Sequence, residues 1–360
     1  MKEKTPLIRI AKRSGEELGK AKVWAIRIGA LLVALIIGGI IIACLGINPF
    51  SAYGIMVSSS LAKGLGRRQV LKSMIPLLGT ALALAPCFKM KYWNIGAEGQ
   101  ITMGAIGCTY FALFWVNKVP APVCMLLMVL GSIVLGGIWA AIPALFKAKW
   151  GTNETLFTLM LNYIGIGIAR YLQGGPWEGV KGSQLVPQFS DTLQLPKVLG
   201  VHCGWIIVLV LVFIIFVYMK YTKQGYEIAV LGDSENTARY AGMDVPKVII
   251  RTAFISGAIS GLVGFMLAAG TNGTLNADIA NGAGFTAITV AWLAQLNPFA
   301  MIVIAFMLAV LSRGASSLNT KLGVPITISD SITGIILLCM LGCEFFINYR
   351  LIFRHHKEEA

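Results

Sequence analysis

One short polar stretch carries a carboxylate between two long apolar runs. Residues 94–100 read NIGAEGQ, and Glu98 is the acidic residue among them. If these runs cross a bilayer, a charge near its centre costs roughly 2.5 to 3.5 kcal/mol on insertion scales, so Glu98 needs water or a partner. Two hypotheses stay open. In one, Asn94, Glu98 and Gln100 line a gate or tie two broken helices together. In the other, Asn94 caps a helix whose first turns hold Glu98.

A second group of polar side chains lies inside, or at the ends of, other apolar runs. Amide and aromatic groups exchange hydrogen bonds with neutral, hydroxyl-rich solutes without requiring a counter-charge. They also cross-link neighbouring helices, so a solute path and a structural role both stay open. The candidates in or beside the fifth apolar run, residues 155–172, are Asn153, Glu154, Asn162 and Tyr163. Those at the end of the eighth run, residues 284–295, are Gln295 and Asn297.

The composition shows what kind of protein must position these residues. The chain has 360 residues, of which 56% are hydrophobic and 13% are charged, and its mean hydropathy is +0.75. A spanning helix needs about 20 mostly apolar residues. The sequence therefore predicts an all-α, polytopic membrane helical bundle of about ten transmembrane helices. The predicted spans cover residues 28–47, 73–88, 101–116, 121–146, 155–172, 204–219, 252–270, 284–295, 298–312 and 332–349.

The basic residues flank these runs and set the expected orientation. The net charge is +14, yet no basic domain with interleaved aromatic residues suggests nucleic acid. The first 27 residues hold eight basic and three acidic side chains, which predicts a cytoplasmic N-terminus. Arg350, Arg354 and Lys357 predict a cytoplasmic tail. The first apolar run exceeds a signal-peptide core of 7 to 15 residues, so we expect a retained anchor instead of a cleaved signal.

In this topology Glu98 lies between Gly96 and Gly99 at the cytoplasmic entrance of the third span. Arg67 and Arg68 fall on the outer side, against the charge rule, which favours a re-entrant or interfacial element within residues 48–72. Gly257, Gly261 and Gly264 are spaced for close helix contacts.

The cytoplasmic segment 220–251 is too long for a simple connector. Asp233 or Ser234 is suited to cap a short helix, and Gly242 to end it in a left-handed conformation. Asp244 and Pro246 then predict a second helix start. Two hypotheses stay open for this segment. Its short helix transmits force to a partner protein, or the whole segment is a solvated connector.

Four blocks of the sequence carry a resemblance to a known family. They are NIGAEGQITMGAIG (94–107), GTNETLFTLMLNYI (151–164), ARYAGMDVPK (238–247) and GFTAITVAWLAQLNP (284–298). Together they resemble permease subunits of bacterial ATP-binding-cassette (ABC) importers for simple sugars and nucleosides, the branched-chain amino acid and ribose-like permeases. The longer nucleoside permease is the nearest match. The similarity runs from about residue 48 onward.

The resemblance implies a passive transport subunit with several partners. These are a second homologous permease, ABC ATPase subunits, an extracytoplasmic substrate-binding protein or lipoprotein, and membrane lipid, in a bacterial cell membrane. The segment 220–251 becomes a coupling segment within a permease domain of residues 28–350, between a basic segment 1–27 and a tail 351–360. The residues implied in coupling to the ATPase are Glu235, Asn236, Ala238, Arg239, Tyr240 and Gly242.

No catalytic or metal site is expected in this chain. Its three histidines and seven cysteines form no metal or catalytic pattern, and no GxxxxGK[ST] loop occurs. ATP and Mg²⁺ are therefore expected on the partner ATPase. The alternative is an ion-coupled secondary transporter of a small polar solute, which predicts ionisable residues at mid-span. Glu98, Glu154 and Glu344 are instead predicted near span ends. A membrane-embedded enzyme would require a convergent catalytic group that the sequence lacks.

Overall fold

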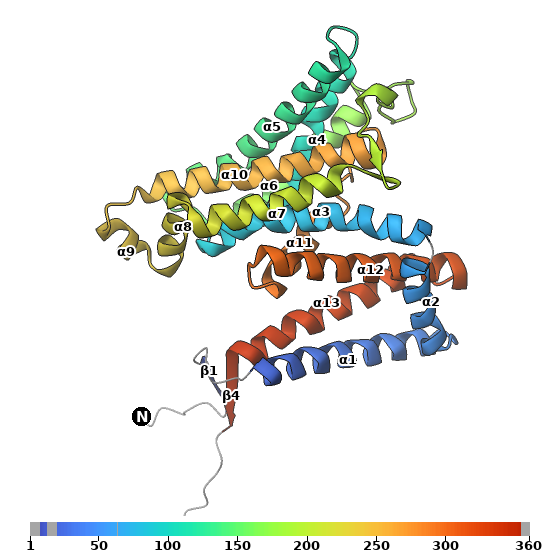
Figure 1. Ribbon diagram of the computed structural model, residues 1–360, viewed down its shortest axis with the longest axis vertical. Coiled ribbons are helices and arrows are strands. Elements are labelled where there is room, and N and C mark those ends of the chain that lie inside the picture. The colour runs from blue at the N-terminus through green and yellow to red at the C-terminus, as the bar shows by residue number, and fades with distance from the viewer. Residues whose placement is uncertain (1–7, 13–19, 63, 354–360) are drawn as a thin grey trace, which may run out of the picture. The chain divides into compact units, whose positions relative to one another are not determined.

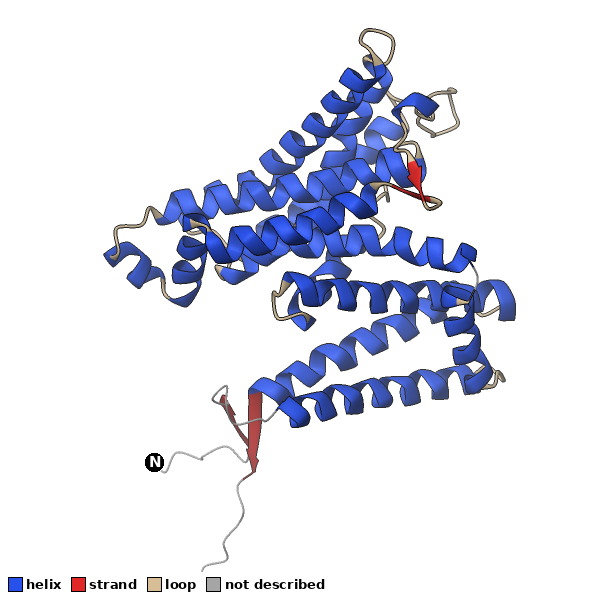
Figure 2. Ribbon diagram, viewed as in Figure 1, coloured by secondary structure: helices blue, strands red, loops and turns tan. Residues whose placement is uncertain are grey.

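The computed structural model describes residues 8–12, 20–62 and 64–353, and most of them are helical (Figure 2). Six helices in this part of the chain have the length and composition of a membrane span, or seven if a bent pair counts as one more. A helical membrane protein is thus confirmed, but the predicted number of about ten spans is not. The six are α3 (Gly64–Lys89), α5 (Ala121–Trp150), α6 (Glu154–Gln173), α7 (Gly204–Tyr221), α10 (Val245–Phe265) with its π-helical continuation η2 (Met266–Asn272), and α12 (Pro298–Leu322).

Two predicted spans correspond to shorter or more polar helices. Helix α4 (Ala97–Phe114) begins with Glu98 and Gln100 and is not apolar enough to qualify. Helix α11 (Ala283–Leu293) has 11 residues, or about 16 Å at 1.5 Å per residue, roughly half of a 30 Å hydrocarbon core. Positive φ angles at Gly282 and Gln295 interrupt the backbone before and after α11. The apolar run there is therefore only partly helical.

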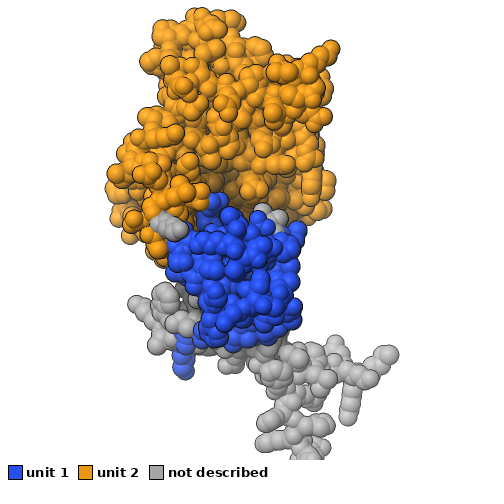
Figure 3. Space-filling model, turned by 90° about the vertical axis from the view of Figure 1, so that its right-hand side faces the viewer, with its two compact units in different colours: residues 1–59, 311–360 blue, residues 60–310 orange. Residues whose placement is uncertain are grey.

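The chain forms two compact units, coloured separately in Figure 3. The first comprises residues 1–59 and 311–360. It contains α1 (Lys20–Cys44), most of α2 (Pro49–Leu61), the end of α12, α13 (Ile326–Asn348), and the antiparallel strands β1 (Ile8–Lys12) and β4 (Tyr349–Phe353). Residues 1–7 and 13–19 of the predicted basic segment, and 354–360 of the tail, lie outside the described residues.

The segment 48–72, where the sequence favoured a re-entrant or interfacial element, contains a sharp bend. The pair Leu32–Cys44 and Pro49–Leu61 is bent by 113°, as in a broken span or a re-entrant loop. Tyr53 in α2 donates a hydrogen bond to the carbonyl of Leu35 in α1 at 2.6 Å, which holds the bend. Arg67 and Arg68 lie beyond it, in the first turns of α3.

The second unit, residues 60–310, has two distinct ends (Figure 1). At one end lie α8 (Lys223–Asp233), α9 (Glu235–Tyr240) and the start of α10. We call this the α9 end. The last turn of α3 also belongs to it, because a Cβ on Gly232 of α8 would lie 3.2 Å from the Cα of Met90. At the opposite end lie η1 (Asp191–Leu193) and the paired strands β2 (Lys197–Val198) and β3 (Val201–His202).

Glycines let three helices of this unit pack backbone to backbone. A Cβ on Gly261 of α10 would overlap the carbonyl oxygen of Ser132 in α5. A Cβ on Gly264 would overlap the carbonyl oxygen of Ile101 in α4, and one on Gly257 that of Gly136. The close contacts predicted from the glycine spacing in α10 are therefore confirmed.

Replacing Gly261 with alanine is expected to lower the free energy of unfolding by about 1–3 kcal/mol, because α5 and α10 must separate to admit the methyl group. Thermal unfolding of the full chain in detergent measures the effect. Gly167→Ala on α6 is the matched control, since no atom lies within 4 Å of its Cβ position. Equal melting temperatures for the two variants would contradict this packing.

Candidate functional site

Glu98 joins the beginnings of α4 and α11. Its side chain lies inside the unit, with 5% of the residue exposed. One carboxylate oxygen accepts a hydrogen bond from the backbone N–H of Gly282 and the other from that of Gly284, both at 2.7 Å. The first N–H groups of a helix have no partner within it and carry partial positive charge. Glu98 therefore caps α11 from a position 184 residues earlier in the sequence.

Asn94 and Gln100 are bonded to each other and to α10. The Asn94 amide nitrogen donates to Ser256 Oγ at 3.2 Å, and the Gln100 amide nitrogen donates to Asn94 Oδ1 at 2.9 Å. Asn94 is not the residue that caps α4 by position, because the helix begins at Ala97 after Gly96. Asn94 Oδ1 instead accepts the N–H of Gly96 at 3.0 Å within the preceding turn.

Helix α6 holds the same stretch from another side. Asn162 Oδ1 accepts the N–H of Gly99 at 2.8 Å, and its amide nitrogen donates to the Ile95 carbonyl at 2.9 Å. Thr158 Oγ1 accepts the N–H of Ile95 at 3.2 Å. A Cβ on Gly99 would lie 2.9 Å from the Cα of Asn162, so glycine is required for this approach. We call Asn94, Glu98, Gln100, Thr158, Asn162 and Ser256 the polar cluster.

The polar cluster lies well beyond the first residues of α6 and α10. Asn162 follows the first residue of α6 by eight positions and Ser256 follows that of α10 by eleven, or about 12 and 17 Å at 1.5 Å per residue. The entrance position of Glu98 stays a prediction, but its neighbours lie several turns into both helices. The cause is a non-helical segment, 92–96, that enters the unit before α4 begins.

A small cavity adjoins the polar cluster. Its volume is about 250 Å³ and Glu98, Thr102, Asp278 and Asn281 supply polar side chains to its wall. Asp278 pairs with Arg170 near the end of α6 at 3.3 Å, and both side chains are largely exposed. The carboxylate that caps α11 therefore also faces a space of the size that a few water molecules occupy.

The other path candidates do not join the polar cluster. Asn153 and Asn297 cap α6 and α12, accepting the N–H groups of Leu156 at 3.2 Å and Phe299 at 3.0 Å. Glu154 pairs with Lys147 at 2.9 Å. Tyr163 is 66% exposed on α6, and Gln295 stands in the turn after α11 with φ of 50°.

The short helix predicted within the segment 220–251 is α9, which has six residues and lies between the predicted cap and the predicted left-handed glycine. Ser234 Oγ accepts the N–H of Thr237 at 3.3 Å, and Gly242 has φ of 74°. Asp244 caps α10 through Lys247 N–H at 3.2 Å, with Pro246 in the first turn. These local predictions are confirmed. Helix α8, which precedes α9, was not predicted.

Most of α9 is exposed, while one residue anchors it. Glu235, Asn236 and Arg239 are exposed and Tyr240 is 91% exposed. Arg239 pairs with Glu235 at 2.7 Å. Ala238, a predicted contact to a partner, is fully buried in an apolar cluster with Met90, Tyr92, Ile228, Leu231, Val245 and Val248. It therefore fastens α9 to the ends of α3 and α8 and the start of α10 instead of facing outward.

A buried histidine lies at the opposite end of this unit. His202 Nε2 lies 3.1 Å from Thr271 Oγ1 in η2, and Nδ1 has no partner among the described residues. Burial, aided by the charge of Lys72, lowers the pKa of His202 to about 4. Since the unfolded pKa is about 6.5, its contribution to stability is complete above pH 6.5. That contribution is lost as the pH falls toward 4, because only the unfolded chain takes up the proton readily.

Acidification from pH 7.5 to 5 is therefore expected to cost about 2 kcal/mol of stability through His202. The difference in melting temperature between the wild type and His202→Gln, measured across this range in detergent, isolates the contribution from that of the carboxylates. Parallel pH profiles for the two proteins would contradict the assignment.

Comparison with known proteins fixes the family. The sequence profile of the family described as "Branched-chain amino acid transport system / permease component" matches residues 67–341. The chain belongs to this family. The permease is 34% identical to the glucose ABC transporter permease protein TsgB13 of Haloferax volcanii over 338 residues, 89% of this chain and 88% of that one.

Two further relatives cover similar lengths. The permease is 27% identical to the guanosine ABC transporter permease protein NupP of Bacillus subtilis, over 86% of this chain and 90% of that one. It is 26% identical to the nucleoside ABC transporter permease protein NupB of Lactococcus lactis, over 89% and 91%. The resemblance seen in the sequence blocks is confirmed. The chain is an ABC transporter permease subunit and a multi-pass membrane protein, a transport component instead of an enzyme.

Proposed function

We propose that this permease forms the translocation path for a nucleoside or a simple sugar in an ABC importer of a bacterial cell membrane. The relatives named for glucose, guanosine and nucleosides support this class of solute. The structural observation that carries the proposal is the buried Glu98 contact, where α4 and α11 both begin beside a polar cavity. A contact that joins the beginnings of two helices is suited to hold one wall of a path in place.

The polar cluster gives this path a gate. Asn94, Gln100 and Asn162 supply neutral donors and acceptors, which match a solute rich in hydroxyl groups. Their hydrogen bonds hold α4, α6 and α10 together when no solute is present. A passing solute exchanges these bonds for its own, while Glu98 keeps the start of α11 in place. Asn153, Glu154, Tyr163, Gln295 and Asn297 then support helix ends and surfaces around the path.

Helix α9 is the proposed contact to an ATPase subunit. Its exposed Glu235, Asn236, Arg239 and Tyr240 would enter a groove on that subunit, and Gly242 ends the helix. ATP and Mg²⁺ bind to the ATPase, and this chain supplies the moving path. The buried Ala238 would pass a displacement of α9 to Met90 and Tyr92, which directly precede the polar cluster.

The remaining partners complete the assembly. A second homologous permease lies beside this one, an extracytoplasmic binding protein or lipoprotein delivers the solute, and lipid surrounds the spans. The permease domain is residues 28–350, with 220–251 as its coupling segment. Residues 1–27 and 351–360 lie in the cytoplasm, as the basic residues near both ends support.

Affinity purification in mild detergent tests the proposal. We expect an ATPase with two nucleotide-binding domains and a second permease to accompany the tagged chain. Vesicles that contain the purified complex should take up radiolabelled guanosine or glucose when ATP is supplied on the α9 side. Vesicles that contain this chain alone should not accumulate either solute. Accumulation against a gradient by the chain alone would overturn the proposal.

A further inference from the structure

Three exposed cations gather at the end of the second unit that lies opposite α9. Arg67 and Arg68 stand in the first turns of α3, and Lys197 stands in β2. No carboxylate of the described residues pairs with any of them. Arg68 approaches the β2–β3 turn, since a Cβ on Gly200 would overlap its guanidinium. In the topology predicted from the sequence, Arg67 and Arg68 lie on the outer side of the membrane, whereas basic residues are usually more frequent on the cytoplasmic side.

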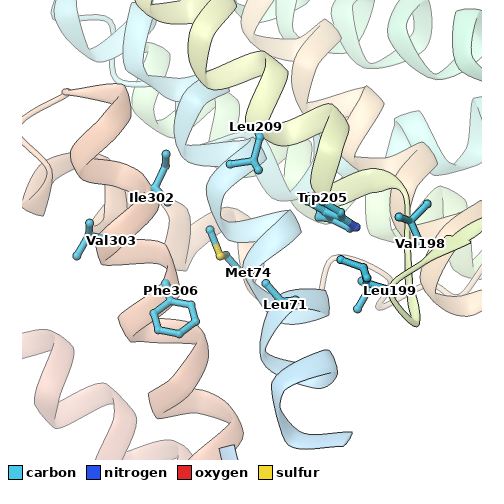
Figure 4. Close-up of a pocket in the computed structure, with 10 residues that line it drawn as sticks. Leu71, Met74, Val198, Leu199, Trp205, Leu209, Ile302, Val303 and Phe306 are labelled. Carbon is cyan, nitrogen blue, oxygen red and sulfur yellow. The ribbon is translucent and has the colours of Figure 1, made fainter. Parts of the chain in front are cut away.

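A groove begins directly beside these cations. Its volume is about 460 Å³, and side chains of α3, α7 and α12 face one another across it (Figure 4). Every residue of its lining is apolar apart from the indole nitrogen of Trp205. The lining comprises Leu71, Met74, Val198, Leu199, Val201, Trp205, Leu209, Ile302, Val303 and Phe306.

The cations lie on two of the elements that line the groove, α3 and β2. Residues three and four apart lie on one face of a helix, so Arg67, Leu71 and Met74 form a single stripe of α3. Lys197 directly precedes Val198, which lines the groove beside Leu199. From Arg67 to Met74 the stripe descends about 10 Å at 1.5 Å per residue. The positive charges therefore stand at one mouth of the groove and the apolar lining continues below them.

We propose that this groove binds an anionic phospholipid, with one acyl chain along Leu71, Met74 and Leu209 and the phosphate of the headgroup on Arg67, Arg68 and Lys197. All three helices that form the groove have the length and composition of membrane spans, so acyl chains of the bilayer are the apolar ligand available to it. An acyl chain matches its apolar lining, and the cations stand only where a headgroup would lie. Basic residues at the membrane surface attract anionic lipids, and tryptophan favours the same interface.

A lipid phosphate also accounts for the unusual position of the two arginines. A guanidinium binds a phosphate through two parallel hydrogen bonds, which makes arginine suited to this contact. The bound lipid would supply the negative charge that no carboxylate of the described residues places beside Arg67. The proposal does not depend on the transported solute or on the ATPase.

Native mass spectrometry of the full chain in detergent tests the proposal. Phosphatidylglycerol and phosphatidylcholine with the same acyl chains are the probes. We expect the wild type to bind phosphatidylglycerol more tightly, and Arg67→Gln with Arg68→Gln to weaken that binding about tenfold while leaving phosphatidylcholine binding nearly unchanged. Lys118→Gln with Lys181→Gln, two exposed residues outside the groove, is the matched control. Equal binding of the two lipids by the wild type, or equal effects of the two double variants, would overturn the proposal.

A second variant separates a lipid from other occupants. Val303→Trp fills the groove without changing charge and should weaken phosphatidylglycerol binding severalfold. Inorganic phosphate that binds as tightly as the lipid would show an anion site without a chain, against the proposal. Disulfide cross-linking of Val303→Cys to a second protein chain in native membranes would instead make the groove a subunit interface, which also overturns it.

Discussion

Glu98→Leu is expected to reduce solute uptake by at least tenfold and to lower the melting temperature of the permease. The substitution leaves the N–H groups of Gly282 and Gly284 without their acceptors inside the unit. Each buried donor left unpaired costs about 1–3 kcal/mol, so the expected loss of stability is about 2–6 kcal/mol. Helix α11 would lose its fixed starting point beside the cavity. Thermal unfolding in detergent and uptake by the reconstituted complex measure the two effects.

Glu98→Gln separates the charge of this side chain from its hydrogen bonds. Glutamine keeps one oxygen acceptor but turns an NH₂ donor toward the second N–H, so we expect a loss smaller than that of leucine. Asp278→Asn is the control, because this carboxylate belongs to the same cavity but its ion pair is exposed and worth less than about 1 kcal/mol. Equal loss of uptake in Glu98→Gln and Glu98→Leu would mean that the charge itself is essential. It would count against a cross-linking role.

The helix ends that the sequence predicted depend on nearby residues. Ser234, Gly242 and Asp244 act within three residues of their own positions, through a cap, a positive φ and a second cap. Such signals are complete within a short window of sequence, so they can be recognised without the fold. The same holds for Gly261, because small-residue spacing identifies the face of a helix that packs closely.

The polar cluster could not be predicted as a unit, because its contacts join residues that lie far apart in the sequence. The partners of Glu98 are backbone N–H groups near residue 283, and Ser256 lies 162 residues from Asn94. Hydropathy locates apolar runs, but it does not show that residues 92–96 are not helical or that α11 has only 11 residues. The contact between Glu98 and the start of α11 could therefore not be predicted from hydropathy. Thr158, one turn before Asn162 in the same block, could have been added to the candidates from its spacing alone.

The two predicted functional regions are joined by one apolar cluster. Ala238 of α9 packs with Met90 and Tyr92, and Asn94 follows two residues later with its bond to Ser256 of α10. Val245 and Val248 of α10 belong to the same cluster. We therefore expect a displacement of α9 to reach the polar cluster along two elements, the segment after α3 and α10 itself. This continuity makes exposed residues of α9 the place where transport should be most sensitive to a change far from the solute.

Arg239→Ala combined with Tyr240→Ala is therefore expected to uncouple ATP hydrolysis from uptake. Both side chains are exposed, and arginine and tyrosine are enriched among interface hot spots, where truncation costs about 2 kcal/mol or more. Loss of both should weaken ATPase docking by about a hundredfold or more and reduce uptake at least tenfold. Ala238 stays in place, so the permease should still insert and unfold at nearly the wild-type temperature. Uptake, ATP hydrolysis and the amount of co-purified ATPase are measured on the same preparations.

A matched pair on the opposite side distinguishes loss of docking from general damage. Tyr171 and Lys181 are an exposed tyrosine and an exposed base outside the α9 end, and their replacement by alanine should leave ATPase binding unchanged. Because Glu235 loses its partner when Arg239 is removed, Glu235→Ala is tested alone as well. An exposed pair at positions i and i+4 contributes only about 0.5 kcal/mol, so this single change should have little effect on stability. Normal uptake by the Arg239 and Tyr240 double variant would show that force reaches the permease through some element other than α9.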